Sequence, residues 1–247
     1  MSPSLESLPL PGRALAELVG SALLLAAIVG SGIAAQRLSP QDGGLELLES
    51  SLATGAALAA LILAVGPVSG AHLNPLVTLT DHLLGGVGRL ECLVYWAAQA
   101  GGAVLGTILA NLMFGLAPVE LSTRARLGPD LWLSEGLATF GLLFVIFSLV
   151  RSRRATLVPF GAGAYITAAY WFTSSTSFAN PAVTMARTLS NTFAGIAPGS
   201  VAPFLLAQLV GTGVAVAVLR LLDPGGSGVD QVLTQGTEPG EPVDELG

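Results

Sequence analysis

The chain has 247 residues, of which 52% are hydrophobic and 11% are charged, and its mean hydropathy is +0.72. A soluble domain carries roughly 25% charged residues, so this composition excludes an ordinary water-soluble globular protein and indicates a chain that folds in lipid. The single cysteine, Cys92, excludes an intrachain disulfide and a cysteine metal site. The net charge is −6, but six acids follow residue 222, so the charge says little about a ligand.

Six apolar runs follow one another at 14–35, 51–68, 91–116, 131–150, 157–173 and 201–222. Each is close to the roughly 20 residues that a helix needs to cross the hydrocarbon core. The first run resembles a secretory signal ending near residue 35, but it is too long, contains Glu17 and follows only one positive charge, so we interpret it as a transmembrane helix. Residues 1–12 and the acidic stretch 223–247 are rich in Pro and Gly, which predicts disordered tails around one membrane domain at 13–222.

A five-residue motif, Asn-Pro-x-Val-Thr, occurs twice, starting at Asn74 and at Asn180. Asn is a preferred N-cap residue and Pro suits the first helical position, so each copy predicts the start of a helix. Both helices should be short, since Gly85-Gly86 ends the first and Gly195 and Pro198 bound the second. Two capped half-helices among membrane spans predict a pore at the point where they meet.

The two halves of the chain repeat. Glu17, Asn74 and Gln99 in the first half recur in the same order as Glu135, Asn180 and Gln208. With three spans in each half (about 13–116 and 131–222), the second half must enter the membrane from the opposite face. Inverted repeats of this kind place their site near the bilayer midplane, at broken helices.

Arginine placement predicts the orientation. If both termini are cytoplasmic, six arginines lie inside and four outside, and the Arg151-Ser152-Arg153-Arg154 cluster strengthens this weak bias.

The chain resembles the major intrinsic proteins, the aquaporin and aquaglyceroporin family. Three segments carry the resemblance: 16–20 (Ala-Glu-Leu-Val-Gly), 69–75 (Ser-Gly-Ala-His-Leu-Asn-Pro) and 178–182 (Phe-Ala-Asn-Pro-Ala). The resemblance implies an all-α membrane protein: an aquaporin-like right-handed bundle of six transmembrane helices plus two re-entrant half-helices, forming a homotetramer in the cell (plasma or inner) membrane. It implies a passive channel and not an enzyme, with no cofactor, metal or nucleic acid.

The resemblance also implies roles for residues near the midplane. The amides of Asn74 and Asn180, in the motifs Asn74-Pro75-Leu76 and Asn180-Pro181-Ala182, would face the pore. Backbone carbonyls would line its two arms, and by motif match they belong to Gly70, Ala71, His72, Thr176, Ser177 and Phe178. Glu17 and Glu135 would accept hydrogen bonds from loop N–H groups, while His72 would position its loop. Leu76 replaces the usual Ala and would either narrow the midplane or repack behind it.

The selectivity filter is where the chain departs from the family. By the family's offsets, its four residues are Thr54, Ala168, Ser177 and Val183, and Val183 stands where Arg is usual. Small side chains predict a wide filter, and the missing Arg removes five N–H donors and a fixed charge. Such a filter is similar to that of a bacterial branch associated with arsenic handling, whose solutes would be arsenous acid and methylated arsenicals. Arg187, four residues further along, would either restore a charge at the mouth, or instead extend to the interface or pair with an acid of a loop.

We therefore expect a passive channel for small uncharged solutes: glycerol-like polyols, arsenous acid, methylated arsenicals and water. Three alternatives stay open: a water-selective aquaporin, a proton-coupled transporter that uses Glu17 or Glu135, and a membrane scaffold with a closed pore.

Overall fold

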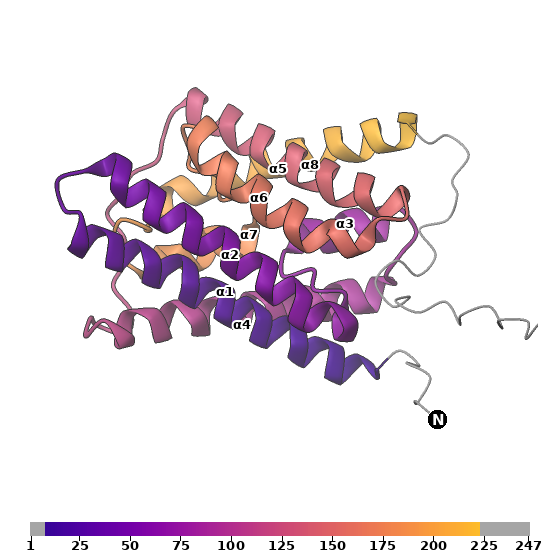
Figure 1. Cartoon of the computed structure of the whole chain (residues 1–247), viewed down its shortest axis with the longest axis horizontal. Helices are drawn as coiled ribbons and strands as arrows, with labels where there is room; N and C mark the ends of the chain where they lie inside the picture. The colour runs from indigo at the N-terminus through magenta and orange to yellow at the C-terminus, as the bar shows by residue number, and fades with distance from the viewer. Residues whose placement is uncertain (1–7, 223–247) are drawn as a thin grey trace, which may run out of the picture.

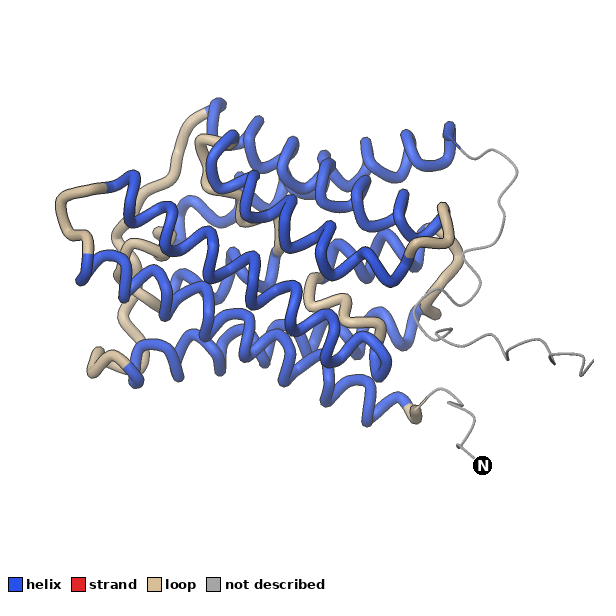
Figure 2. The backbone as a smooth tube through the Cα atoms, in the orientation of Figure 1, coloured by secondary structure: helices blue, strands red, loops and turns tan. Residues whose placement is uncertain are grey.

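The computed structural model describes residues 8–222, in which every regular element is a helix (Figure 2). The expected C-terminal tail and residues 1–7 of the expected N-terminal tail lie outside this range. The N-terminal boundary at residue 12 was too late, because the first helix already begins at Leu10.

The long helices are α1 (Leu10–Leu38), α2 (Gly43–Ser69), α4 (Arg89–Met113), α5 (Pro129–Arg151), α6 (Val158–Phe172) and α8 (Val201–Leu222). Two short helices, α3 (Pro75–Leu83) and α7 (Pro181–Ala186), follow the two asparagines. Single 3₁₀ turns lie at Ala155–Leu157 (η1), Arg187–Leu189 (η2) and Pro198–Ser200 (η3). The second half-helix is shorter than expected, since it ends well before Gly195.

Five helices, α1, α2, α4, α5 and α8 with its preceding turn, are long and apolar enough to cross a membrane by length and composition. The fifth of the six predicted spans differs. Its helix α6 has 15 residues, which at 1.5 Å per residue extends about 22 Å, less than the ~30 Å of a hydrocarbon core. The other helices mostly extend beyond their apolar runs; α2 begins eight residues early because Asp42 caps it, its Oδ1 accepting from the Leu45 N–H at 2.9 Å.

The repeat predicted from sequence organises the bundle. In Figure 1, α1, α2 and α4 occupy the lower half of the view, and α5, α6 and α8 the upper half. Helices α1 and α4 pack together, as do α5 and α8, while α2 packs on α6 across the two halves. The two half-helices α3 and α7 contact each other. The start of α1 and the end of α8 lie at the same end of the bundle (Figure 1).

Glycines bring the paired helices into close contact. A Cβ atom on Gly106 of α4 would collide with the Ala22 carbonyl oxygen of α1, and one on Gly211 of α8 would collide with the Gly136 carbonyl oxygen of α5. Small residues serve membrane helices in this way because lipid provides no hydrophobic force between helices, so close packing must stabilise them.

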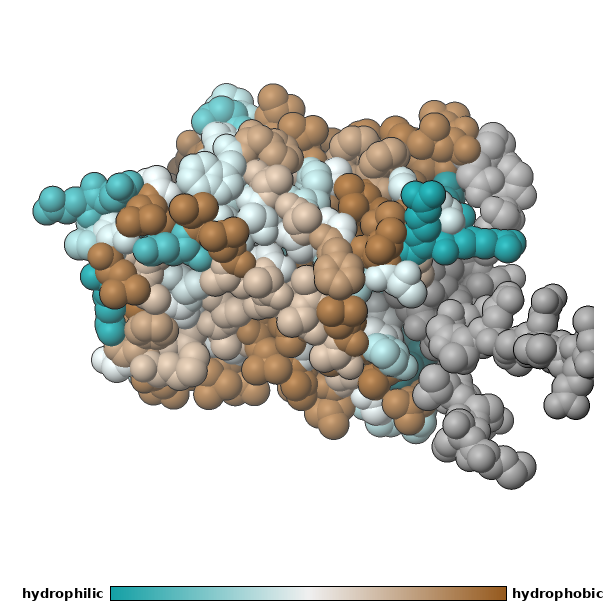
Figure 3. Space-filling view, viewed as in Figure 1, coloured by the Kyte–Doolittle hydropathy of each residue, from teal (hydrophilic) through white to brown (hydrophobic). Residues whose placement is uncertain are grey.

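Apolar side chains cover the outside of the bundle. Figure 3 shows hydrophobic residues across the middle of the molecule and hydrophilic ones toward its two ends. Leu133, Leu206 and Val210, for example, are 74%, 65% and 67% exposed. A surface of this kind is stable against acyl chains, which agrees with a membrane protein.

Candidate functional site: a cavity between two half-helices

The two asparagines cap the half-helices as expected. Asn74 Oδ1 accepts from the Leu76 N–H at 2.9 Å, and Asn180 Oδ1 accepts from the N–H groups of Ala182 and Val183 at 2.9 and 3.3 Å. These bonds use the oxygen of each amide and so fix which way its nitrogen points.

Each asparagine also holds the loop of the other half. Asn74 Nδ2 donates to the Ala179 carbonyl oxygen at 2.8 Å, and Asn180 Nδ2 donates to the Leu73 carbonyl oxygen at 2.8 Å. An amide nitrogen carries two hydrogens, so each asparagine keeps one donor for a further partner. Both line the same cavity.

The two carboxylates support the loops that precede the asparagines. Glu17 accepts from Ser69 Oγ and from the backbone N–H groups of His72 and Leu73 at 2.7–2.9 Å. Glu135 accepts from the N–H groups of Phe178 and Ala179 at 2.9 and 3.0 Å. Both side chains are completely buried, so these bonds offset the cost of burying a charge.

Two glutamines complete the supports. Gln99 Nε2 donates to Glu17 at 2.8 Å and to Thr78 Oγ1 at 3.0 Å. Gln208 Nε2 repeats this with Glu135 at 2.7 Å and Thr184 Oγ1 at 2.9 Å. Each glutamine thus joins a carboxylate to a half-helix.

The loops before the asparagines have an unusual backbone. Ala71, Leu73, Ser177 and Ala179 have φ angles of 48–50°, in the left-handed region that side chains rarely adopt. Gly70, Ala71, His72, Ser177 and Phe178 all line the cavity, whereas Thr176 does not. None of these six residues offers its carbonyl oxygen to a hydrogen bond within residues 8–222, so the carbonyl oxygens of the five cavity-lining residues remain available as acceptors.

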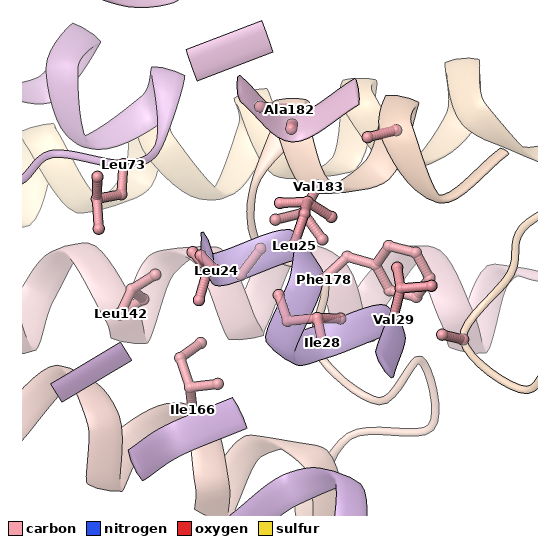
Figure 4. Close-up of a cluster of buried hydrophobic side chains, with 14 of the residues drawn as sticks. Leu24, Leu25, Ile28, Val29, Leu73, Leu142, Ile166, Phe178, Ala182 and Val183 are labelled. Carbon is pink, nitrogen blue, oxygen red and sulfur yellow. The ribbon is translucent and has the colours of Figure 1, made fainter. Parts of the chain in front are cut away.

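One cavity runs past both half-helices. Its part beside 70–73 and α3 is named the α3 arm, and its part beside 176–179 and α7 the α7 arm; Asn74 and Asn180 lie where the arms meet. Three of the four expected filter residues line it: Thr54, Ser177 and Val183. Figure 4 shows Val183 among the buried side chains of Phe178, Leu24 and Ile28, which also border the cavity.

The structure corrects the fourth filter residue. Ala168 is exposed on the outside of α6 and does not line the cavity. Tyr170 lines it instead, and its hydroxyl lies 3.2 Å from Thr54 Oγ1. Two residues along a helix turn a side chain by about 200°, so a small error of offset exchanges the inner and outer faces.

Arg187 is buried, with 3% of its surface exposed, and lines the cavity. Its guanidinium lies 3.6 Å from the centre of the Phe178 ring, and Nε donates to the Ala194 carbonyl oxygen. The terminal nitrogens have no hydrogen-bond partner within the described part of the chain. The extension of Arg187 to the interface is therefore wrong, and no acid pairs with it among residues 8–222.

Leu76 and His72 have packing roles. Leu76 is buried against Leu143, Phe147 and Leu219 and does not border the cavity, so it repacks behind Asn74 instead of narrowing the pore. His72 Nδ1 lies 3.0 Å from Thr78 Oγ1, which ties its loop to α3.

Arg126 is a further structural residue that the sequence reasoning missed. It donates to the carbonyl oxygens of Gly195, Ser175 and Phe193 at 3.0–3.4 Å and so ties two loops of the α7 arm together. Burial, with the nearby Arg187 and Arg124 charges, lowers the pKa of Arg126 to about 9, so it remains a cation at neutral pH. Nothing in the sequence pattern distinguishes it from the other loop arginines.

The threonines that follow the asparagines were visible as the last letter of the repeated motif. Thr78 and Thr184 each donate to the carbonyl of their asparagine, at 3.2 and 2.8 Å, and accept from a glutamine.

Comparison with known proteins agrees with this geometry. Residues 4–170 match the family model described as "MIP: Major intrinsic protein". "Aquaglyceroporin AqpS" of Rhizobium meliloti (strain 1021) is 49% identical over 221 residues, 89% of this chain and 94% of that protein. "Aquaporin NIP2-1" of Oryza sativa subsp. japonica is 31% identical over 194 residues, 74% of this chain and 63% of that protein.

Among solved structures, the X-ray structure of the aquaglyceroporin from Plasmodium falciparum has the same fold. It matches with a TM-score of 0.65 at 20% sequence identity, over 88% of this chain and 99% of that chain. The resemblance inferred from the motifs is therefore confirmed: the chain belongs to the major intrinsic protein family, whose aquaglyceroporins are channels and not enzymes.

Proposed function

We propose that the protein is a passive membrane channel for small uncharged solutes: glycerol-like polyols, arsenous acid, methylated arsenicals and water. The observation that carries this proposal is the pair of asparagines where the arms meet. Each has its oxygen occupied by a helix cap and one N–H occupied by the opposite loop, so each can offer one donor to a solute oxygen.

The dipoles of the half-helices act at the same place. Helices α3 and α7 both begin at these asparagines, so each directs the positive end of its dipole toward the middle of the cavity. A proton or metal cation meets an unfavourable potential there, while an uncharged hydroxyl does not. Arg187 adds a second cation barrier in the α7 arm. Free carbonyl oxygens along both arms accept from solute O–H groups.

The lining of the α7 arm favours solutes larger than water. Val183 offers a small apolar wall, Thr54, Tyr170 and Ser177 offer hydroxyls, and the guanidinium of Arg187 lies one turn beyond Val183. Arsenous acid is neutral and presents three hydroxyls, as glycerol does, so the same groups can hold either solute. A methyl group on arsenic would contact the apolar wall. The similarity to an aquaglyceroporin supports the polyol part of the proposal.

The hydrogen bonds of the two carboxylates argue against proton coupling. Glu17 accepts four hydrogen bonds and Glu135 three, and neither borders the cavity. Protonating either would place an O–H against N–H donors. We therefore assign both to the support of the loops.

The remaining proposals concern the setting. We assign the channel to the cell (inner) membrane of a bacterium, as the bacterial aquaglyceroporin relative suggests. The α1 start and α8 end share one end of the bundle, which supports placing both termini on the cytoplasmic side with the Arg151–Arg154 cluster. A homotetramer would cover part of the exposed apolar surface, and the lipid bilayer the rest.

A solute-flux panel tests the proposal. Liposomes containing the purified protein would be mixed in a stopped-flow instrument with an osmotic gradient for water flux. They would then be mixed, in separate runs, with gradients of glycerol, urea, arsenite and a methylated arsenical. We expect rapid flux of water, glycerol and arsenite through the wild type. The control is the Asn180→Ala variant, in which we expect solute flux to fall. Rapid water flux with no solute flux would favour the water-selective alternative.

The other two alternatives have their own signatures. Uptake driven by a pH gradient, and abolished by Glu17→Gln or Glu135→Gln in folded protein, would favour a transporter. Absence of all flux in well-folded oligomers would favour a closed scaffold.

A further inference from the structure

The repeat places opposite charges at equivalent positions of the two arms. Asp81 lies seven residues after Asn74, and Arg187 lies seven residues after Asn180. Both line the cavity, Asp81 in the α3 arm and Arg187 in the α7 arm. Their contacts are equivalent too: Asp81 Oδ2 is 4.0 Å from Nε2 of His72, two residues before its asparagine, and Arg187 stacks on Phe178, two residues before the other.

The cation barriers of this pore attract anions. The two helix dipoles present positive ends where the arms meet, and Arg187 adds a full positive charge whose terminal nitrogens are unpartnered within residues 8–222. The residues that make the channel selective against cations would by themselves draw a small anion inward. A negative charge on the pore wall would oppose that attraction and add to the cost of removing water from the anion.

Asp81 is placed where it can supply that charge. Its side chain is 13% exposed and borders the cavity. Oδ2 accepts from the Val87 N–H at 2.8 Å, whereas Oδ1 has no hydrogen-bond partner within the described residues. An acid near the C-terminal end of a helix opposes the helix dipole, so the stability of α3 does not account for a carboxylate there.

We infer that Asp81 is the residue that excludes anions from this channel, with Arg187 as its oppositely charged counterpart in the other arm. This inference rests on the proposed function, because it assumes that the cavity is a path for solutes. An anion that enters past Arg187 and the asparagines meets the carboxylate in the α3 arm. A neutral solute passes both charges, since it can donate to Asp81 and accept from Arg187.

The variant Asp81→Asn removes the charge while its amide oxygen can still accept from the Val87 N–H. In planar bilayers under a potassium chloride gradient, we expect negligible ionic conductance from the wild type. We expect Asp81→Asn to conduct chloride at least about tenfold above it, with a reversal potential displaced toward the chloride equilibrium value. The sign of that potential reports charge selectivity, which a merely loosened structure would not set.

A second variant tests the counterpart. Adding Arg187→Gln to Asp81→Asn removes the charge that concentrates anions, so chloride conductance should fall about tenfold from that of Asp81→Asn. The matched control is Asp130→Asn, which removes an equal charge at an exposed position away from the cavity. Water flux in liposomes normalises for folded protein.

Two outcomes separate the inference from the proposed function. If Asp81→Asn keeps wild-type water flux but conducts no chloride, or conducts potassium instead, Asp81 is not the anion barrier. If the wild type passes no neutral solute, the proposed function fails, and chloride conductance of Asp81→Asn still decides the inference.

Discussion

Val77 and Val183 occupy equivalent places in the two halves of the channel, three residues after Asn74 and Asn180, and both line the cavity. Aquaporins that select water or glycerol typically carry Arg at the second of these places, so the two arms of this pore are more alike than the family resemblance implies. Because Val is smaller than Arg, Val183 leaves more room in the α7 arm, which favours the passage of larger solutes.

The variant Val183→Arg should slow the larger solutes. The new side chain fills the α7 arm and adds a second guanidinium beside Arg187. We expect glycerol and arsenite permeability to fall about tenfold, corresponding to a barrier increase of about 1.4 kcal/mol, with water permeability reduced less. Stopped-flow light scattering on liposomes measures all three. Val183→Leu, which adds bulk without charge, separates the effect of size from the effect of charge. Unchanged glycerol flux in Val183→Arg would show that Val183 does not line the solute path.

The variant Glu135→Gln should destabilise the protein. Its amide presents an NH₂ group where the carboxylate accepts from three donors, so at least one buried N–H loses its partner. The expected cost is about 1–3 kcal/mol, seen as a lower midpoint of thermal unfolding in detergent. Glu17→Gln should behave alike, because Glu17 holds the equivalent loop. A variant with wild-type stability and lost pH-driven uptake would instead support proton coupling.

The variant Asn180→Ala should lose both stability and flux. It removes the α7 cap, worth about 0.5–2 kcal/mol, and the bond to the Leu73 carbonyl. It also removes the free donor, so solute flux should fall further than folding loss explains. Asn180→Ser keeps an oxygen that can cap α7 but is too short to reach the Leu73 carbonyl. Comparing its flux with its melting temperature separates the role of Asn180 in stability from its role in solute passage. Equal flux per folded channel in Asn180→Ala would mean that the amide does not contact the solute.

The variant Gly106→Ala should weaken the packing of α1 on α4. The new methyl group would collide with the backbone carbonyl of Ala22, which can yield only if the helices separate. Overpacking of this kind costs about 1–3 kcal/mol, measurable by thermal unfolding. Gly101→Ala on the same helix is the control, because a Cβ there would meet no atom of another described segment within 4 Å, and its stability should equal or exceed wild type. Equal melting temperatures for the two variants would contradict this packing.

The variant Arg126→Gln should loosen the loops of the α7 arm. Arg126 donates to three carbonyl oxygens that no shorter amide can reach together, and leaving them unpartnered costs about 1–3 kcal/mol. Arg124→Gln is the control, since Arg124 is exposed and, among residues 8–222, its side chain stacks on Phe193 without donating a hydrogen bond. Hydrogen exchange of residues 190–197 should quicken in Arg126→Gln alone. If both variants exchange alike, the loops do not depend on Arg126.

Much of the site was predictable because its chemistry is local. An Asn-Pro pair starts a helix wherever it occurs, and a carboxylate within an apolar run must find donors. The caps at Asn74 and Asn180 and the buried supports at Glu17 and Glu135 follow from these two facts and their repetition.

The filter depended on tertiary structure, because which side of a helix faces the pore is settled by how that helix packs. The sequence assigned Ala168, but the rotation of α6 between α2 and α5 brings Tyr170 to the cavity. The burial of Arg187 likewise needs the Ala194 carbonyl and the Phe178 ring, which come from separate loops. The sequence by itself determined the half-helices and the support of their loops, since neighbours along the chain dictate them; only the packing of distant segments decided which side chains a solute meets.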